Sequence, residues 1–532
     1  MIDDRPLTRT RAHPPAGPVP LTVLAVGATV LCTVPLVYLT VRVLAGGPAA
    51  LDRWLLRQRT VELAVTTVAL AAAVIIGSLL LGVATAWATT RVRLPAPRLW
   101  LILAALPLAV PSYVSAFAWV ATIPGLNGFW PLVLIMVLAT TPYVTLPVAA
   151  ALRMADLRQS DAARTLGSSR VRVFRTVSLP QLWPAAAAGA LLVGLYAISD
   201  FGAPAMLRVQ VMTWAVRASY LVSFDRNAAA ALALVLVALA LLLTVGELVA
   251  RRGVMRRRPA VNAPRPRPRR VSPPATVVIM VGLGLVATAS VVLPLAALIR
   301  RMLLAEGVVA ALDWERLTSA TATTLGLGIA GALAATLFAL PLAALAARHP
   351  GRLAEALQVV AFVGHGLPGI VVGLALVFTT LALVPIAYQS FAALVFAYVV
   401  LFLPKSLAAS RGALENVSPT LDLVAQTLGR SRRRAFWDIT VRLAWPGIAA
   451  GALLVMLTVM KELPATLMLR PTGSTTLATT LWDRTAVARY ASATPYAIAL
   501  VVLAALPAWL LSDRPRRETA TQGSTPQNEV DR

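Results

Sequence analysis

The sequence predicts an all-α polytopic protein that crosses a membrane about twelve times. Only 13% of its 532 residues are charged, whereas ordinary soluble domains carry roughly 25%. The mean hydropathy is +0.77, and apolar runs of about 20 residues, the length that a helix needs to cross a bilayer, recur along the chain. Because backbone amides in lipid must be satisfied within the chain, we expect these runs to form helices.

Short polar segments separate the apolar runs and set the approximate ends of each span. We expect the first six spans at residues 19–44, 61–88, 99–123, 131–152, 182–205 and 228–250. The next six are expected at residues 275–299, 320–347, 356–383, 387–409, 447–469 and 493–512. Prolines and glycines around Pro111 and His365 are expected to bend the third and ninth spans.

The net charge of +26 comes from arginines that lie between the spans rather than on a soluble domain. This is the excess that membrane topology produces on the cytoplasmic side, where arginine meets anionic lipid, so we expect the lipid bilayer and no nucleic acid as a partner. The same rule places both termini in the cytoplasm. The segment that holds Arg53, Arg57 and Arg59 departs from the rule.

Composition divides the chain into five segments. Two apolar blocks of six spans each are separated by a basic, Pro-rich stretch that we expect to be a cytoplasmic linker. The segments are a cytoplasmic N-terminal tail (1–18), a first repeat (19–250), the linker (251–274), a second repeat (275–512) and a disordered C-terminal tail (513–532).

The two blocks of spans repeat one another in sequence. The stretch "LWPAAAAGALLV" (182–193) lies 262 residues before "AWPGIAAGALLV" (444–455). Earlier in each block, the Thr-Thr pair of "AVTTVAL" (64–70) matches that of "TATTLGL" (321–327). Because each block has an even number of spans, both copies keep the same orientation, and we expect two parallel six-helix repeats.

A polar, Arg-rich segment precedes the fifth span, and a similar one precedes the eleventh. In the first, Asp161 lies in an expected first helical turn, and Gly167 permits a left-handed turn between two short helices. Pro180 is expected to end the second of these helices. In the second segment, Ser418 is the expected helix cap and Gly429 the expected turn.

These segments resemble the EAA signature of importer-type ABC transporter permeases, which reads acid-Ala-Ala, three residues, glycine, nine residues and aliphatic-x-Leu-Pro. In the first segment the signature residues are Asp161, Ala162, Ala163, Gly167, Leu179 and Pro180. The second segment keeps Ala425, Gly429 and Ile439, but its acid, Asp422, comes one residue early and Arg442 replaces the proline.

The resemblance implies a fused double permease with the type I ABC importer permease fold, in a bacterial plasma (inner) membrane. In that family each polar segment is a coupling helix that docks on a cytoplasmic ATPase. The implied partners are two copies of this ATPase, which bind the ATP, and an extracytoplasmic substrate-binding protein.

The residues themselves predict no chemistry within this chain. Neither of the two lysines, Lys405 and Lys461, lies in a phosphate-binding loop, so we expect no enzyme activity, no catalytic residues and no cofactor. The three histidines are scattered along the chain, so we expect no metal site.

Charged residues within the spans are candidates for the transport path, because charge is costly in lipid. Asp200 and Glu462 occupy equivalent positions of the fifth and eleventh spans, and Lys461 adjoins Glu462 and could neutralise a neighbouring charge. We expect these three residues to line or gate the path near the outer ends of their spans, with structural pairing as the alternative. His365 is a further candidate, with a packing or hydrogen-bonding role as the alternative.

The substrate is suggested by a second resemblance. The sequence "KELPATLMLRP" (461–471) followed by "TTLAT" (475–479) is similar to permeases of ferric-iron importers, with "SDFGAPAML" (199–207) as its counterpart. This implies iron(III), delivered by a carrier that supplies the oxygen ligands Fe³⁺ needs. Thiamine and phosphonate are alternatives within the family. A secondary transporter driven by an ion gradient is the alternative of another class, and it would not need the coupling segments.

Overall fold

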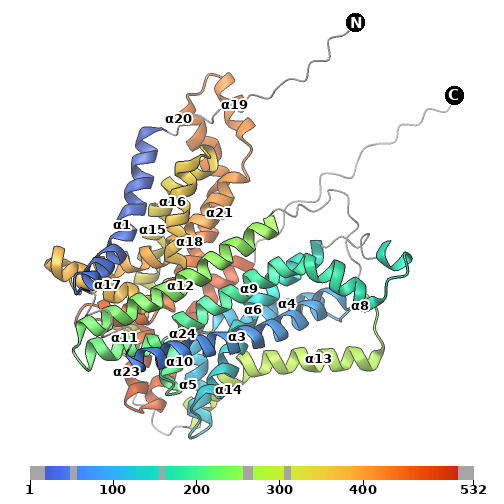
Figure 1. Ribbon diagram of the computed structural model, residues 1–532, viewed down its shortest axis with the longest axis horizontal. Coiled ribbons are helices and arrows are strands. Elements are labelled where there is room, and N and C mark those ends of the chain that lie inside the picture. The colour runs from blue at the N-terminus through green and yellow to red at the C-terminus, as the bar shows by residue number, and fades with distance from the viewer. Residues whose placement is uncertain (1–17, 48–56, 155–161, 256–267, 305–312, 513–532) are drawn as a thin grey trace.

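The computed structural model describes residues 18–47, 57–154, 162–255, 268–304 and 313–512 (Figure 1). Within these ranges the regular structure is helical, and the backbone bridge between Val92 and Arg269 is isolated. The expected all-α class is confirmed. The predicted tails, apart from Pro18, lie outside the described residues.

Nine helices in the described ranges are long and apolar enough to cross a membrane, and a bent pair makes a tenth. In the first half these are α1 (Val19–Leu44), α3 (Gln58–Arg91), α6 (Phe129–Met154), α9 (Leu179–Ser199) and α12 (Arg226–Met255). In the second half, α13 (Pro273–Ala287) and α14 (Leu293–Leu304) form one span, followed by α15 (Trp314–Arg348), α18 (Phe391–Glu415) and α21 (Arg442–Met460). Shorter apolar helices occupy the other two expected spans, α17 (Gly369–Leu383) in one and α24 (Tyr490–Ser512) in the other.

The third and ninth expected spans are broken at proline. α4 (Pro97–Ala105) and a 3-10 turn (Leu106–Ala109) meet α5 (Ser112–Thr122) at an angle of 88°. Pro111 immediately precedes α5, because proline lacks the N–H that would extend the earlier helix. Pro368 has the same place before α17, after α16 (Arg352–Val363) and the turn η4 (Gly364–Gly366). The expected bends are therefore complete breaks.

The fifth and eleventh spans end earlier than hydropathy predicts. α9 ends at Ser199 and α21 at Met460, so the expected limits at residues 205 and 469 are wrong. The residues that follow form the separate short helices α10 (Gly202–Met206) and α22 (Pro464–Leu469). Hydropathy misses this break because α10 (GAPAM) and α22 (PATLML) contain no charged residue that would mark the end of a span.

Repeat-equivalent glycines bring the long helices of each half together. A Cβ atom on Gly189 of α9 would lie 2.7 Å from the carbonyl oxygen of Tyr143 on α6. A Cβ on Gly451 of α21 would lie 2.5 Å from the Cβ of Ala409 on α18. Both distances are too short for a side chain, so glycine at these two positions permits the close helix contact.

The repeated Thr-Thr pairs also have a structural role. The backbone N–H of Met212, which opens α11 (Met212–Leu221), donates to Oγ1 of Thr67 at 3.0 Å. The N–H of Leu477, which opens α23 (Leu477–Ala486), donates to Oγ1 of Thr324 at 2.9 Å. In each half, therefore, a threonine of a long span satisfies the first amide of a short helix that would otherwise lack a partner.

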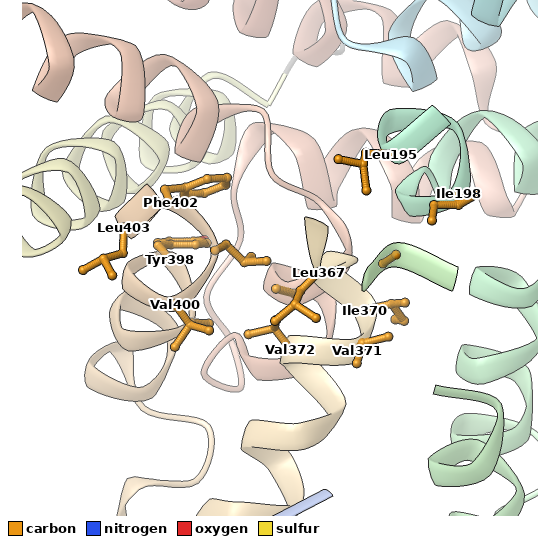
Figure 2. Close-up of a cluster of buried hydrophobic side chains, with 14 of the residues drawn as sticks. Leu195, Ile198, Leu367, Ile370, Val371, Val372, Tyr398, Val400, Phe402 and Leu403 are labelled. Atoms are coloured by element: carbon orange, nitrogen blue, oxygen red, sulfur yellow. The ribbon is translucent and has the colours of Figure 1, made fainter. Parts of the chain in front are cut away.

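The first span of each half packs on the other half. α1 contacts α15, α16 and α17, whereas α13 contacts α4 and α14 contacts α5 (Figure 1). The hydrophobic core also crosses this boundary, and Figure 2 shows Leu195 and Ile198 of α9 in one cluster with Leu367 and residues of α17 and α18. The two halves therefore form one packed body.

The expected linker, residues 251–274, is described in part. α12 continues into it as far as Met255, and residues 256–267 lie outside the described ranges. Arg269 bonds to the end of α3, with its N–H donating to the oxygen of Arg91 at 2.8 Å and its oxygen accepting from Arg93 N at 3.0 Å. The division of the chain into five segments stays a prediction.

Candidate functional site

A cavity of about 270 Å³ lies where the two halves meet. The ends of α9 and α21, the starts of α5 and α17, and parts of α6 and α18 line it. Its polar lining consists of Ser112, Tyr113, Tyr143, Tyr196, Ser199, Asp200, Lys405, Thr458, Lys461 and Glu462.

The polar lining follows the sequence repeat. Eight of these residues form four pairs whose members lie 262 residues apart, so both halves build the cavity from the same places in their helices. The pairs are Tyr143 with Lys405, Tyr196 with Thr458, Ser199 with Lys461, and Asp200 with Glu462.

The structure brings together the three charged residues that the sequence singles out. Asp200, Lys461 and Glu462 all line this one cavity, although the first is more than 250 residues from the other two. The side chain of His365 lies outside the described part of the chain. Its backbone belongs to η4, two residues before Leu367, which lines the cavity.

Asp200 follows the end of α9 and holds the start of α10. Its carboxylate accepts the backbone N–H of Ala203 at 3.2 Å and a hydrogen bond from the hydroxyl of Ser112. Its carbonyl oxygen accepts from Oγ1 of Thr213 at 2.8 Å. The carboxylate satisfies an amide that the helix start leaves unpaired, and it ties α9 to α5.

Glu462 has the same role at the start of α22. Its carboxylate accepts the N–H of Ala465 and the N–H of Thr466, each at 3.0 Å, and the hydroxyl of Thr466 at 2.8 Å. The same hydroxyl is 2.8 Å from the hydroxyl of Tyr398 on α18. Both carboxylates thus cap the start of a short helix, which is a structural role, and both also line the cavity.

Lys461 does not pair with its neighbour Glu462. Its Nζ donates to the carbonyl oxygen of Leu108 at 2.7 Å, across the boundary between the halves. No salt bridge joins Lys461 to a carboxylate within the described residues. Lys461 and Glu462 thus have different hydrogen-bond partners among the described residues, and neutralisation of a neighbouring acid by Lys461 stays a prediction.

Sequence reasoning misses Lys405 and the three tyrosines of the cavity. Lys405 lies in the middle of an apolar run, and a charge in such a place is the signal that could have identified it. Tyr143 and Tyr196, whose ring centroids are 5.8 Å apart, give no such signal, because tyrosine is common in apolar helices. Only the packing of α6 against α9 brings them to one wall.

The first polar segment is described from Ala162 onward, so Asp161 lies outside the described residues. Ala162 and Ala163 begin a single helical turn that ends at Gly167, whose φ of +80° is left-handed. Ser168 donates its N–H to the oxygen of Ala163 at 3.0 Å, which is the long hydrogen bond of a Schellman cap. Glycine makes the sharp turn that the sequence predicts.

The second polar segment makes the same turn. α19 ends at Thr427 (Pro419–Thr427) and is followed by a turn at Gly429, whose φ is +86°. Arg430 donates its N–H to the oxygen of Ala425 at 3.0 Å. The shift of the acid by one residue therefore leaves the turn unchanged. At the tips of the two turns lie the equivalent residues Leu166 and Leu428, which are 85% and 80% exposed.

Each polar segment enters its span through a π-helical turn, Phe174–Ser178 before α9 and Phe436–Val441 before α21. Pro180 does not end a helix as expected, because residues 171–199 form one helical span. Leu179 and Pro180 are the first residues of α9, directly after the wide π turn, where the missing N–H of proline is tolerated. Ile439 lies within the second π turn.

The early acid of the second segment points toward the helix bundle. The carboxylate of Asp422 accepts the hydroxyl of Thr440 at 2.7 and 2.8 Å. Arg348, the last residue of α15, lies 3.8 Å from the same carboxylate and donates to the Thr440 hydroxyl at 3.2 Å. Asp422 therefore anchors α19 to the body of its half.

Comparison with known proteins places these features in a family. Residues 78–252 and 339–512 match the family described as the binding-protein-dependent transport system inner membrane component. Over 482 residues the chain is 32% identical to the Fe(3+)-transport system permease protein FbpB 2 of Haemophilus influenzae, covering 90% of this chain and 95% of that protein.

Shorter similarities link the chain to other permeases. It is 30% identical over 184 residues to the sulfate transport system permease protein CysT of Salmonella typhimurium, covering 30% of this chain and 66% of that protein. It is 35% identical over 141 residues to the molybdate/tungstate transport system permease protein WtpB of Thermococcus kodakarensis, covering 26% of this chain and 55% of that protein.

The anchor of the second segment is open to a direct test. Replacing Asp422 by alanine leaves the Thr440 hydroxyl without its acceptor and Arg348 without its ion-pair partner, a loss of about 1–3 kcal/mol in local stability. We expect amide hydrogen exchange of residues 419–441 to rise by roughly 5- to 150-fold, while residues 162–178 keep their rate. Asp438→Ala is the matched control, since Asp438 makes an exposed ion pair with Arg430 in the same segment. Equal exchange in Asp422→Ala and the native chain would refute the anchor.

Proposed function

The chain belongs to the family of binding-protein-dependent transport system inner membrane components, and from that premise we propose that its inter-repeat cavity is the path by which iron(III) crosses the membrane. The chain is a multi-pass membrane protein and a permease subunit of an ABC importer, not an enzyme by itself. The family implies an ATPase and a substrate-binding protein as partners.

One observation carries the choice of iron(III). The similarity to the Fe(3+)-transport permease extends over 90% of this chain and includes both halves, whereas the sulfate and molybdate/tungstate permeases match less than a third of it. Thiamine and phosphonate remain the alternatives within the family, and they are outcomes of the experiment below. The ion-coupled secondary transporter is set aside, because the family is that of binding-protein-dependent systems.

We assign coupling to the two polar segments. Each places an exposed leucine, Leu166 or Leu428, at the tip of a rigid turn on a polar surface, and an exposed apolar group of this kind suits a docking site. With two such segments, one chain would bind two ATPase copies. The signature residues Ala162, Ala163 and Leu179 in the first segment, and Ala425 and Ile439 in the second, would support these docking turns.

The coupling role sets the orientation that we propose. Docking to a cytoplasmic ATPase requires both polar segments, and with them both termini, to face the cytoplasm of a bacterial cell. The cavity would then lie toward the outer side, where an extracytoplasmic binding protein delivers its cargo. α9 and α21 would transmit the motion, because each runs for about 30 Å from a coupling segment to a cavity carboxylate.

In this mechanism the ATPase subunits close on ATP and move the two coupling segments. The cavity is built from both halves, so a change in their relative position opens it to one side or the other. α1 packs on helices of the second half and α14 packs on α5 of the first half, and these contacts keep the halves together during this movement.

The substrate is tested with the reconstituted complex of this chain, its ATPase and candidate binding proteins. We expect the iron-loaded binding protein to stimulate ATP hydrolysis and to deliver radioactive iron into vesicles. Binding proteins loaded with thiamine or phosphonate serve as the comparison. Stimulation by either of these, without stimulation by the iron-loaded protein, would refute iron(III) as the substrate.

Coupling is tested at the first glycine. In Gly167→Trp the left-handed backbone costs roughly 1–2 kcal/mol, and the bulky ring obstructs the docking turn. We expect normal membrane insertion with ATP-driven uptake lowered about tenfold or more, equivalent to at least roughly 1.4 kcal/mol. Gly125→Trp is the matched control, because Gly125 also has a φ of +80° and open space around it but lies outside both polar segments. Unchanged uptake in Gly167→Trp would contradict the coupling role.

The carboxylates of the cavity wall are tested as a pair. The double variant Asp200→Ala and Glu462→Ala removes both helix caps, at a cost of about 0.5–2 kcal/mol each, and we expect lower uptake with membrane assembly intact. The variant Asp200→Asn and Glu462→Gln keeps an acceptor oxygen at both places, so we expect it to restore most of the uptake. Wild-type uptake in the alanine variant would exclude both residues from the path.

A further inference from the structure

Both lysines of the chain lie in the cavity wall. The 532 residues contain 48 basic side chains, and only Lys405 and Lys461 among them are lysines. They come from α18 and from the end of α21, both in the second half. At the equivalent places the first half has the neutral hydroxyls of Tyr143 and Ser199. The positive charge of the cavity therefore comes from one side.

No carboxylate of the described residues pairs with either lysine. Lys461 donates to a carbonyl oxygen, that of Leu108, and the Nζ of Lys405 lies 5.2 Å from the ring centroid of Phe402. Both ammonium groups line the same cavity. Like charges in an apolar setting are costly, and a negative charge between them would relieve that cost.

The acids of the cavity make their hydrogen bonds to backbone amides and hydroxyls rather than to the lysines. Asp200 is occupied by Ala203 N–H and Ser112, and Glu462 by the amides of Ala465 and Thr466. Their oxygens are directed into helix caps rather than toward the lysines. The cavity thus offers donors to a ligand, from two ammonium groups and from hydroxyls such as that of Tyr143.

A bare metal cation does not suit this lining. No group of three or more His, Cys, Asp or Glu side chains able to hold a metal ion occurs within the described ranges. Two ammonium groups would also repel a trivalent cation. The space is sufficient for something larger, because about 270 Å³ far exceeds the roughly 10–15 Å³ that a cavity needs to hold one water molecule.

We propose that the cavity binds an oxyanion through Lys405 and Lys461, with the hydroxyl of Tyr143 as a further donor. The oxyanion is either free or an oxygen ligand of the transported ferric ion, and the second source rests on the proposed function. A tetrahedral oxyanion accepts hydrogen bonds in several directions, which matches donors that converge from α6, α18 and α21.

Binding is measured by calorimetry on the full chain in lipid nanodiscs, with inorganic phosphate and sulfate as the probes. We expect both to bind, and Lys405→Gln to weaken binding about tenfold or more, equivalent to at least roughly 1.4 kcal/mol. Lys405→Arg keeps the charge and should bind within a few-fold of the native chain. Arg352→Gln is the matched control, since Arg352 is exposed at the start of α16, away from the cavity. Absence of binding, or equal binding in Lys405→Gln, would overturn the proposal.

The source of the oxyanion is resolved by uptake into vesicles from the iron-loaded binding protein, with labelled iron and labelled phosphate. Joint uptake of both labels, lost together in Lys405→Gln, supports an oxyanion that travels on iron. Uptake of phosphate without iron supports the cavity site and refutes iron(III) as the substrate. Iron uptake that needs no oxyanion and is unchanged in Lys405→Gln overturns the oxyanion site and leaves the proposed function intact.

Discussion

The architecture depends on a carboxylate that caps a short helix at the end of a long one. In lipid, a helix cannot end without a partner for its unpaired backbone groups. Asp200 and Glu462 supply that partner to α10 and α22, so each span stops early and the chain turns within the protein. The same two residues then form part of the cavity wall. A half-buried carboxylate that lipid would penalise is thereby both stabilised and placed on the boundary between the halves.

Each capped end is connected by one helix to a polar turn at the other end of the same span. α9 and α21 run from the Schellman turns at Gly167 and Gly429 to the cavity, and a π-helical turn at the base of each joins turn and helix. The close contacts at Gly189 and Gly451 hold these helices against α6 and α18. The first span of each half also packs on helices of the other half, which adds contacts between the halves. A displacement at either turn therefore acts on a packed helix rather than on a loose loop.

The two halves share this plan but differ in charge. Both halves have the same turn geometry, a carboxylate that caps a short helix, and a threonine that accepts the first N–H of another short helix. The lysines, in contrast, occur only in the second half. The anchor from Asp422 to Arg348 is also known only there, because Ser160, its counterpart in the first half, lies outside the described ranges. A symmetric frame thus surrounds a cavity that has one acid from each half but lysines from the second half alone.

The all-α membrane class, the repeat and the turns at Gly167 and Gly429 can all be predicted from the sequence. The same holds for the equivalence of Asp200 and Glu462 in the two repeats. These are local properties, because hydropathy, glycine and repeat spacing act within one helix or one turn. Tertiary structure alone decided that Lys461 bonds across the boundary to Leu108 and that Asp422 turns inward. It also decided that Lys405 joins the tyrosines at one cavity. Those contacts join helices far apart in the chain, and their partners depend on how the helices pack rather than on any neighbouring sequence.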